Sequence, residues 1–303
     1  MARVLVVGAG GVGGAFGAAM AQAGHDVVFV ARGANLQALR TGGLKVIGAR
    51  GDFTLPKVQA TDTAAEAGDR DLILLTVKSY DLEEAAETVR SCGGIVLTLQ
   101  NGVDAAERVR GVLGDVALAG TTGIVADLEE PGLVRVVSTY SRIIFGEPEG
   151  VWSSRTEAVH EWLSAGGWID SQPREDVRIA LWEKMALICA MGGLTTLYDQ
   201  PMGPILSDPH GRATFRTVVE EVEAVGRARG VPLPAGLVED RLAYAGTVDP
   251  QATSSMSRDL RRGKRVEVDH LNGAIVRMGA ELGVPVPVNT AVYAGIRLAA
   301  SKA

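Results

Sequence analysis

Short apolar segments recur along the first 120 residues, separated by longer stretches that hold most of the charged residues. Five of these segments are almost wholly apolar and show no alternation with polar positions: Val4–Val7, Val27–Val30, Leu72–Val77, Ile95–Leu99 and Val116–Ala119. Strands of this kind are buried on both faces, as in a parallel sheet that is covered on each side by its connecting helices. The pattern therefore predicts an α/β fold for the N-terminal part of the chain.

The pattern changes after about residue 131. Leu133–Val137 and Arg142–Phe145 resemble an antiparallel pair of strands, and beyond Pro173 the apolar residues recur with the period of a helix. We expect helices at about 174–191, 210–228, 236–245, 255–262, 266–282 and 288–300. The predicted organisation is an α/β domain over residues 1–172 and an all-helical domain over residues 173–303.

Length and charge agree with two globular domains and exclude some classes of partner. The chain has 303 residues, and domains average about 150. Its formal charge of −6 argues against a nucleic-acid-binding protein, which usually carries a basic face, and against a polybasic membrane-surface protein. With 47% hydrophobic and 22% charged residues, the chain can bury a core, which argues against intrinsic disorder.

Targeting signals and metal motifs are missing from the sequence. No run of about 18 uncharged apolar residues predicts a membrane span, and the start of the chain lacks the pattern of a signal peptide. Two cysteines, Cys92 and Cys189, are too few for a disulfide framework or a metal cluster, and there is no HExxH or GxSxG motif. We therefore expect no metal, and a reducing cytoplasmic location.

A glycine-rich segment follows the first apolar run. It has the pattern GxGxxG and consists of Gly8, Ala9, Gly10, Gly11, Val12 and Gly13. Because it lies between a predicted strand and a predicted helix, it fits the dinucleotide-binding fingerprint of the Rossmann fold. Gly8 would permit the tight turn, Gly10 the approach of a pyrophosphate, and Gly13 close packing of the helix on the strand. The phosphates would bind at the helix N-terminus.

The residue at the end of the second strand indicates which dinucleotide is bound. NAD sites usually place Asp or Glu there, to accept a hydrogen bond from the ribose 2′-hydroxyl. This chain has Arg32 instead, which could pair with a 2′-phosphate through two charge-assisted hydrogen bonds. We therefore expect NADP(H) as the cofactor. The alternative is that Arg32 is a solvated loop charge.

One lysine occupies an apolar stripe. The predicted helix at 174–191 has apolar spacing of 4, 3, 4, 3 through Val177, Leu181, Lys184, Ile188 and Met191. A buried ammonium is costly, and burial lowers its pKa toward the range of a general acid that works near neutral pH. The alternative is a lysine at the edge of the stripe that extends its amine to solvent.

Two further candidates lie in the C-terminal part. Glu267 lies about one residue's rotation off the core stripe of the predicted helix at 266–282, so its carboxylate could hold a lysine or form a surface salt bridge. Ser255 begins another predicted helix and could be its N-cap or a ligand donor.

These segments together resemble the ketopantoate reductase (2-dehydropantoate 2-reductase) family over nearly the whole chain. The shared motifs are Gly8–Gly13 with Arg32, Thr76-Val-Lys78, Gln100-Asn101-Gly102, Gly120-Thr-Thr122, Trp182-x-Lys184, Ser254-Ser255-Met256-x-x-Asp259, Glu267-Val-Asp269-x-Leu-Asn272-Gly273 and Gly283-x-x-x-Pro287-x-Asn289. The resemblance implies an N-terminal Rossmann domain that binds NADP, and a C-terminal helical domain for substrate and catalysis. The helical domain could also supply the interface of a homodimer.

The resemblance also implies roles for individual residues. Lys184 would protonate the carbonyl oxygen as hydride arrives, and Glu267 would orient Lys184 and bind the substrate hydroxyl. Ser255 would hold the substrate carboxylate, and Asn101 and Lys78 would contact the nicotinamide ribose, with Asn101 also near the substrate. Thr122 and Glu267 belong to the residues expected around the cofactor, as do all six residues of the glycine loop.

The function implied is NADPH-dependent reduction of 2-dehydropantoate to (R)-pantoate, a step toward pantothenate and coenzyme A. Ile188 and Gly192 stand where family members place Asn, four and eight residues after the lysine. They motivate an alternative, the same reduction of another 2-oxo acid, ketone or imine in a more apolar pocket. A third reading, a non-catalytic NADP(H)-binding sensor, is disfavoured because Lys184 and Glu267 are both retained.

Overall fold

The computed structural model describes residues 1–301 and divides into two compact units. The N-terminal unit comprises Met1–Gln100 and Asp104–Val177, and the helical unit comprises Asn101–Val103 together with the chain from Arg178 onward. The first contains a mostly parallel sheet, and the regular elements described after Val177 are all helical, so the predicted fold class is confirmed. The division falls after Val177 rather than after residue 172, because the last strand of the sheet ends at Pro173.

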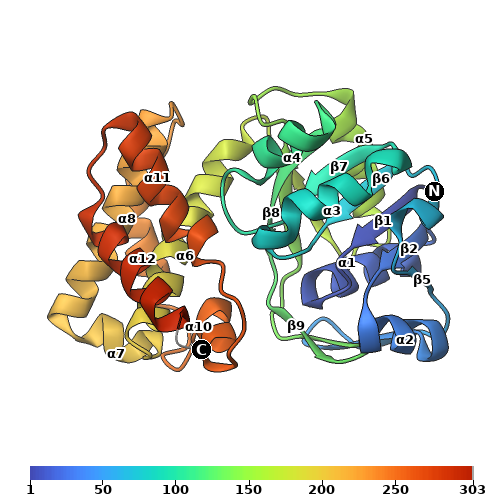
Figure 1. Cartoon of the computed structure of the whole chain (residues 1–303), viewed down its shortest axis with the longest axis horizontal. Coiled ribbons are helices and arrows are strands. Elements are labelled where there is room, and N and C mark those ends of the chain that lie inside the picture. The colour runs from blue at the N-terminus through green and yellow to red at the C-terminus, as the bar shows by residue number, and fades with distance from the viewer. Residues whose placement is uncertain (302–303) are drawn as a thin grey trace. The chain divides into compact units, whose positions relative to one another are not determined.

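The N-terminal unit is built on an eight-stranded sheet (Figure 1). In spatial order its strands are β12 (Asp170–Pro173), β11 (Arg142–Gly146), β8 (Ala117–Gly123), β7 (Ile95–Thr98), β6 (Leu72–Leu75), β1 (Arg3–Val7), β2 (Asp26–Val30) and β5 (Gln59–Thr61). The six strands from β8 to β5 are parallel, and β11 is antiparallel to β8. The strand order reverses between β1 and β6, where open α/β sheets bind ligands at the strands' carboxyl ends.

A second sheet of four strands packs against the first helix, α1 (Gly11–Gln22). Its order is β4 (Phe53–Leu55), β3 (Leu44–Gly48), β10 (Leu133–Val136) and β9 (Ala126–Glu130). Because α1 also contacts β1 and β2, it lies between two sheets, and its small residues make this possible. A Cβ on Gly14 would lie 2.7 Å from Val134, and one on Gly17 would lie 2.5 Å from Phe29.

This second sheet overturns one prediction. The segments Leu133–Val137 and Arg142–Phe145 do not pair with each other: β10 pairs with β3 and β9, whereas β11 pairs with β8 and β12. A tight turn at Gly132, whose φ is +78°, gives β10 a nearer hairpin partner in β9. Ile143 and Phe145 of β11 are buried in the large sheet's core.

The remaining helical segments of the N-terminal unit connect the strands. They are α2 (Gly33–Gly42), α3 (Leu82–Thr88), α4 (Ala105–Leu113) and α5 (Ser154–Ser164), with short 3-10 turns at Ala64–Ala67, Ser79–Asp81 and Arg90–Cys92. The core of this unit is made by Leu, Val, Ile and Phe side chains, mostly from the sheets, and by Ala, Phe and Met residues of α1.

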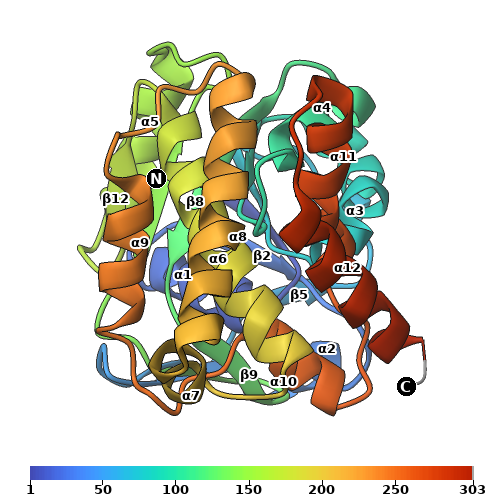
Figure 2. The same ribbon diagram turned by 90° about the vertical axis from the view of Figure 1, so that its left-hand side faces the viewer.

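The helical unit has seven α-helices within the described residues. They are α6 (Val177–Leu197), α7 (Met202–Ser207), α8 (Pro209–Ala228), α9 (Leu237–Ala245), α10 (Ser255–Arg261), α11 (Asn272–Leu282) and α12 (Pro287–Ala300). α8 packs beside α11 and α12 (Figure 2), and α6 contributes much of the unit's second apolar core.

Two predicted helices differ from the structure. The helix expected at 174–191 continues to Leu197 through Gly192 and Gly193. The helix expected at 266–282 begins only at Asn272, and a 3-10 turn (Val268–His270) precedes it. An apolar spacing of three residues fits a 3-10 turn as well as an α-helix, so the pattern alone could not separate the two.

Candidate active site

The glycine loop has the geometry of a phosphate-binding turn. Gly8 has a φ of +101°, and a Cβ on it would lie 2.9 Å from the backbone nitrogen of Val77. A Cβ on Gly13 would lie 2.3 Å from the Gly8 carbonyl oxygen, so this glycine lets α1 approach β1. At Gly10, in contrast, a Cβ would meet nothing within 4 Å. Protein packing does not require glycine there, which leaves the open side of the loop free for a bound group.

The other candidates of the N-terminal unit also lie at carboxyl ends of strands. Arg32 follows β2 and occupies the N-cap position of α2 without a capping side-chain hydrogen bond; its side chain is 78% exposed and its guanidinium contacts the Glu84 carboxylate at 3.2 Å. An ion pair this exposed contributes little and exchanges readily for another anion. Lys78 follows β6 and is half-buried, and Thr122 lies near the end of β8.

The turn after β7 divides between the two units. Gln100 belongs to the N-terminal unit, where its buried side-chain amide donates to the carbonyl oxygens of Leu75 at 2.8 Å and Val77 at 3.1 Å. It thereby fixes the end of β6, close to Lys78. Asn101–Val103 group with the helical unit, and Val103 packs against the helical core.

The structure places Lys184 on a flank of α6 rather than on its most buried face. Val177 and Leu181 of the predicted stripe are buried, but beyond them the buried apolar side chains of α6 are Trp182, Met185, Ala186, Cys189, Ala190 and Leu194. Lys184, Ile188 and Met191 form the neighbouring, half-buried face. The buried stripe contains several small residues, so the hydrophobic pattern did not distinguish it from the adjacent face.

Lys184 and Glu267 nevertheless act on each other. Glu267, which is 7% exposed, precedes the 3-10 turn instead of lying on a long helix as predicted. Loss of solvation lowers the pKa of Lys184 to about 8, and the negative charge of Glu267 opposes this shift. An amine with this pKa can donate a proton near neutral pH.

Ser255 is exposed at the first residue of α10. The helix cap is Ser254, whose hydroxyl accepts a hydrogen bond from the Ser257 backbone N–H at 3.0 Å. The N-cap alternative for Ser255 is therefore wrong. The Thr195 hydroxyl of α6 also donates to Ser254 at 2.9 Å, which ties α10 to the helix that carries Lys184.

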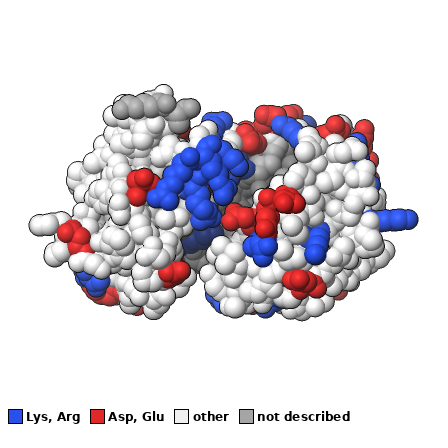
Figure 3. Space-filling view, turned by 90° about the horizontal axis from the view of Figure 1, so that it is seen from below, with Lys and Arg blue, Asp and Glu red and all other residues white. Residues whose placement is uncertain are grey.

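A basic strip connects Ser255 to Glu267 along the chain. It comprises residues 258–265 and holds five cations and one acid, namely Arg258, Asp259, Arg261, Arg262, Lys264 and Arg265. Figure 3 shows Lys and Arg side chains gathered in one area over α10. The Arg261 guanidinium donates to the Asp199 carboxylate at 2.6 Å, whereas Arg262 and Lys264 are exposed residues. The sequence analysis missed this strip, although such a cationic run stands out in an acidic chain.

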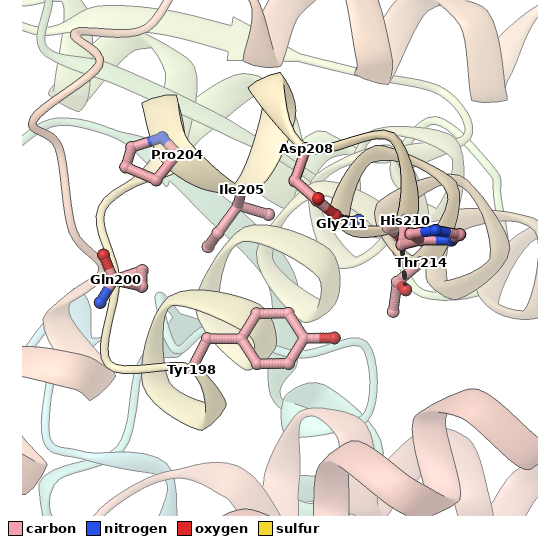
Figure 4. A pocket seen from close by; sticks show the side chains of 8 residues that line it. All are labelled: Tyr198, Gln200, Pro204, Ile205, Asp208, His210, Gly211 and Thr214. Atoms are coloured by element: carbon pink, nitrogen blue, oxygen red, sulfur yellow. Dashed lines mark hydrogen bonds between the residues drawn. The ribbon is translucent and has the colours of Figure 1, made fainter.

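A separate hollow of about 310 Å³ lies at the junction of α6, α7 and α8. Gln200 and Pro204 lie at one end, and His210 and Thr214 at the other (Figure 4). The Asp208 carboxylate on its wall caps α8 by accepting from the Gly211 N–H at 2.6 Å. None of the candidate residues lines this hollow, so we assign it no part in the chemistry.

Metal and membrane features can be assessed for residues 1–301. Within that range no group of three or more His, Cys, Asp or Glu side chains is arranged to hold a metal ion. No helix there combines the length and apolar character needed to cross a bilayer. Cys92 and Cys189 are both free thiols and buried, and burial raises the pKa of each.

Comparison with known proteins identifies the family. The model for "Ketopantoate reductase PanE/ApbA" matches residues 4–150, and the model for its C-terminal domain matches residues 176–300. The chain belongs to the ketopantoate reductase family. It is thus an oxidoreductase, and the resemblance predicted from its motifs is confirmed.

Several known proteins match the chain over nearly its full length. The 2-dehydropantoate 2-reductase of Archaeoglobus fulgidus is 34% identical, over 95% of this chain and 94% of its own. An uncharacterized oxidoreductase of Bacillus subtilis, YkpB, is 30% identical over 98% of each chain. The crystal structure of a family member from Ralstonia eutropha JMP134 has a TM-score of 0.91 and 35% identity, and the match covers 99% of this chain and 98% of that one.

Proposed function

We propose that the protein is an NADPH-dependent reductase that converts 2-dehydropantoate to (R)-pantoate. The observation that carries the proposal is a desolvated Lys184 amine within the electrostatic influence of the buried Glu267 carboxylate. Reduction of a ketone develops negative charge on oxygen, and a positioned proton donor stabilises that charge. Relatives named 2-dehydropantoate 2-reductase that are over 30% identical support this choice of substrate.

The residues of the glycine loop fit a dinucleotide cofactor. Open space in front of Gly10 and the N-terminus of α1 suit a pyrophosphate, and the exposed guanidinium of Arg32 suits a 2′-phosphate. Lys78, Thr122 and Asn101 would contact the nicotinamide end. NADPH, when bound, supplies a hydride.

The chain's own residues would supply the proton and hold the substrate. The Lys184 amine would donate a proton to the substrate carbonyl oxygen, and Glu267 would hold the amine in place and accept a hydrogen bond from the substrate hydroxyl. The exposed Ser255 hydroxyl would bind the substrate carboxylate. The cationic strip at 258–265 favours an anionic substrate through its local positive charge, which stands out in a protein with a formal charge of −6.

A second candidate function keeps the reaction and changes the substrate. Ile188 lies one helical turn after Lys184 on the same half-buried face of α6, and Gly192 one turn further. Neither side chain offers a hydrogen-bond partner to a substrate hydroxyl. This favours a 2-oxo acid or ketone with an apolar substituent.

Steady-state kinetics with purified protein test both candidates. NADPH oxidation is followed by absorbance with 2-dehydropantoate and with a panel of 2-oxo acids, ketones and imines. We expect the highest kcat/KM for 2-dehydropantoate. A 2-oxo acid with an apolar side chain that exceeds it would select the second candidate, and no oxidation with any substrate would refute both.

A further inference from the structure

Three buried polar side chains of the helical unit lie outside the candidate active site. Asn272 and Asn289 are 0% exposed and Glu221 is 7% exposed. Buried polar groups are costly unless hydrogen-bonded, so three of them in contact require an explanation. They come from α11, α12 and α8, which are far apart in the sequence.

The Glu221 carboxylate caps α12 from a neighbouring helix. It accepts hydrogen bonds from the backbone N–H groups of Val288 and Asn289, both at 2.8 Å, and from the Asn289 side-chain amide at 2.8 Å. The N–H groups of a helix's first turn have no partner within the helix, and the N-terminal end favours negative charge. Glu221 thus fixes the start of α12 against α8 and orients the Asn289 side chain.

Asn272 extends this network to the helix that carries Lys184. Its side-chain amide donates to the Asn289 Oδ1 at 2.9 Å and to the backbone carbonyl oxygen of Cys189 in α6 at 3.2 Å. A glycine makes the second contact possible. A Cβ on Gly193 would lie 3.1–3.2 Å from the Asn272 amide atoms and 2.8 Å from Val292.

The contact joins the two segments that bear the acid–base pair. Cys189 follows Lys184 by five residues on α6, and Asn272 follows Glu267 by five residues at the start of α11. A slip of one residue along a helix turns its side chains by about 100° and moves them by about 1.5 Å. A hydrogen bond to one particular carbonyl oxygen excludes such a slip, whereas apolar packing tolerates rearrangement.

We propose that Asn272 is a positioning residue, whose amide fixes α6 against the Glu267 segment and thereby sets the geometry of Lys184 relative to Glu267. Gly193 contributes to the same arrangement, because the absence of a Cβ there leaves room for the Asn272 amide to reach the Cys189 carbonyl oxygen. Glu221 and Asn289 hold the amide from the other side. The inference rests on the proposed function only for its catalytic consequence.

The ionisation of Lys184 reports this geometry directly, without cofactor or substrate. The chain has six lysines, so NMR of protein labelled at the lysine ε-carbon gives few signals, and Lys184→Arg assigns the relevant one. In the wild type we expect Lys184 to titrate near pH 8. In Asn272→Ala we expect a fall of about half a pH unit or more, because the carboxylate that raises this pKa is less well placed. We also expect kcat to fall by about tenfold.

Two glycine variants test the same point with less disturbance. Gly193→Ala should displace the Asn272 amide and lower the Lys184 pKa in the same direction. Gly192→Ala is the matched control, since its Cβ would make ordinary contacts of 3.7 Å with Met256 and 3.9 Å with Ser254. Its Lys184 titration should equal that of the wild type.

The outcomes separate this inference from the proposed function. An unchanged or raised Lys184 pKa in Asn272→Ala, with only a lower melting temperature, would overturn the positioning role. If Asn272→Ala does not fold, the same result in Gly193→Ala overturns it. If the Lys184 pKa falls in these variants but Lys184→Ala retains full turnover, the positioning role of Asn272 stands and the proposed catalytic role of Lys184 fails.

Discussion

The two units hold their candidate residues by different means. In the N-terminal unit, the glycine loop, Arg32, Lys78 and Thr122 follow or end parallel strands, so the sheet alone brings them to one edge. In the helical unit, Lys184 and Glu267 lie on segments more than 80 residues apart and depend on packing between helices. A site made from strand ends tolerates exposed, loosely held side chains. A desolvated acid–base pair requires a rigid support. We therefore expect the helical unit's site to be more sensitive to substitutions in its surroundings than the N-terminal unit's site.

The largest expected effect is on the proton donor. Lys184→Ala should lower turnover by about 100-fold or more, the usual scale for loss of a positioned acid. Binding of NADPH, measured by fluorescence titration, should stay within about twofold. Lys57→Ala, which removes an exposed lysine, is the control and should retain wild-type turnover. Wild-type turnover in Lys184→Ala would remove this residue from the reaction.

Arg32→Ala should weaken NADPH binding by about tenfold or more, since a hydrogen bond to a charged group contributes about 1.5–3 kcal/mol. NADH binding should change little, because NADH has no 2′-phosphate. Dissociation constants for both cofactors measure the difference. Glu84→Ala removes the carboxylate that contacts Arg32 and should leave NADPH binding equal or tighter. An equal loss for both cofactors in Arg32→Ala would contradict the assignment.

The pH dependence of kcat should fall at alkaline pH. Lys184 must be protonated to act as the acid, and its pKa is about 8, so activity should decrease tenfold per pH unit well above pH 8. Glu267→Gln removes the charge that raises this pKa and should move the alkaline limb to lower pH. Full pH–rate profiles of both proteins provide the measurement. An alkaline limb at the same pH in both would show that Glu267 does not affect the pKa of the catalytic acid.

The smallest expected effect concerns the cationic strip. The double variant Arg262→Gln/Lys264→Gln should raise KM for an anionic substrate about threefold at low salt, with kcat unchanged. The difference should shrink in high salt, which screens exposed charges. Lys45→Gln/Lys57→Gln makes the same change in net charge on the N-terminal unit and should have no such effect. Equal increases in both variants would show that only overall charge matters.

The sequence predicted the local features of the fold well. The apolar runs predicted β1, β2, β6, β7 and β8 but not the polar parallel strand β5, and the GxGxxG pattern located the turn, because both signals depend on residues that are neighbours along the chain. It did not give the second sheet, whose strands β3, β4, β9 and β10 are short and whose two hairpins join only through the pairing of β3 with β10, about 90 residues apart. Nor did it place Leu133–Val136 with its partners, since alternation fixes the face of a strand and not its neighbour.

The residue types and their order were thus determined by the sequence alone: a glycine turn, an arginine at the second strand, and a lysine and a glutamate in a helical region. The tertiary structure decided that Lys184 lies on a flank of α6, that Glu267 precedes a 3-10 turn, and that Ser254 rather than Ser255 caps α10. It also joined Asn272 to Cys189. The physical reason is that solvation and hydrogen bonding depend on which helices pack together. Contacts between distant segments produce no periodic pattern of residue types in the sequence.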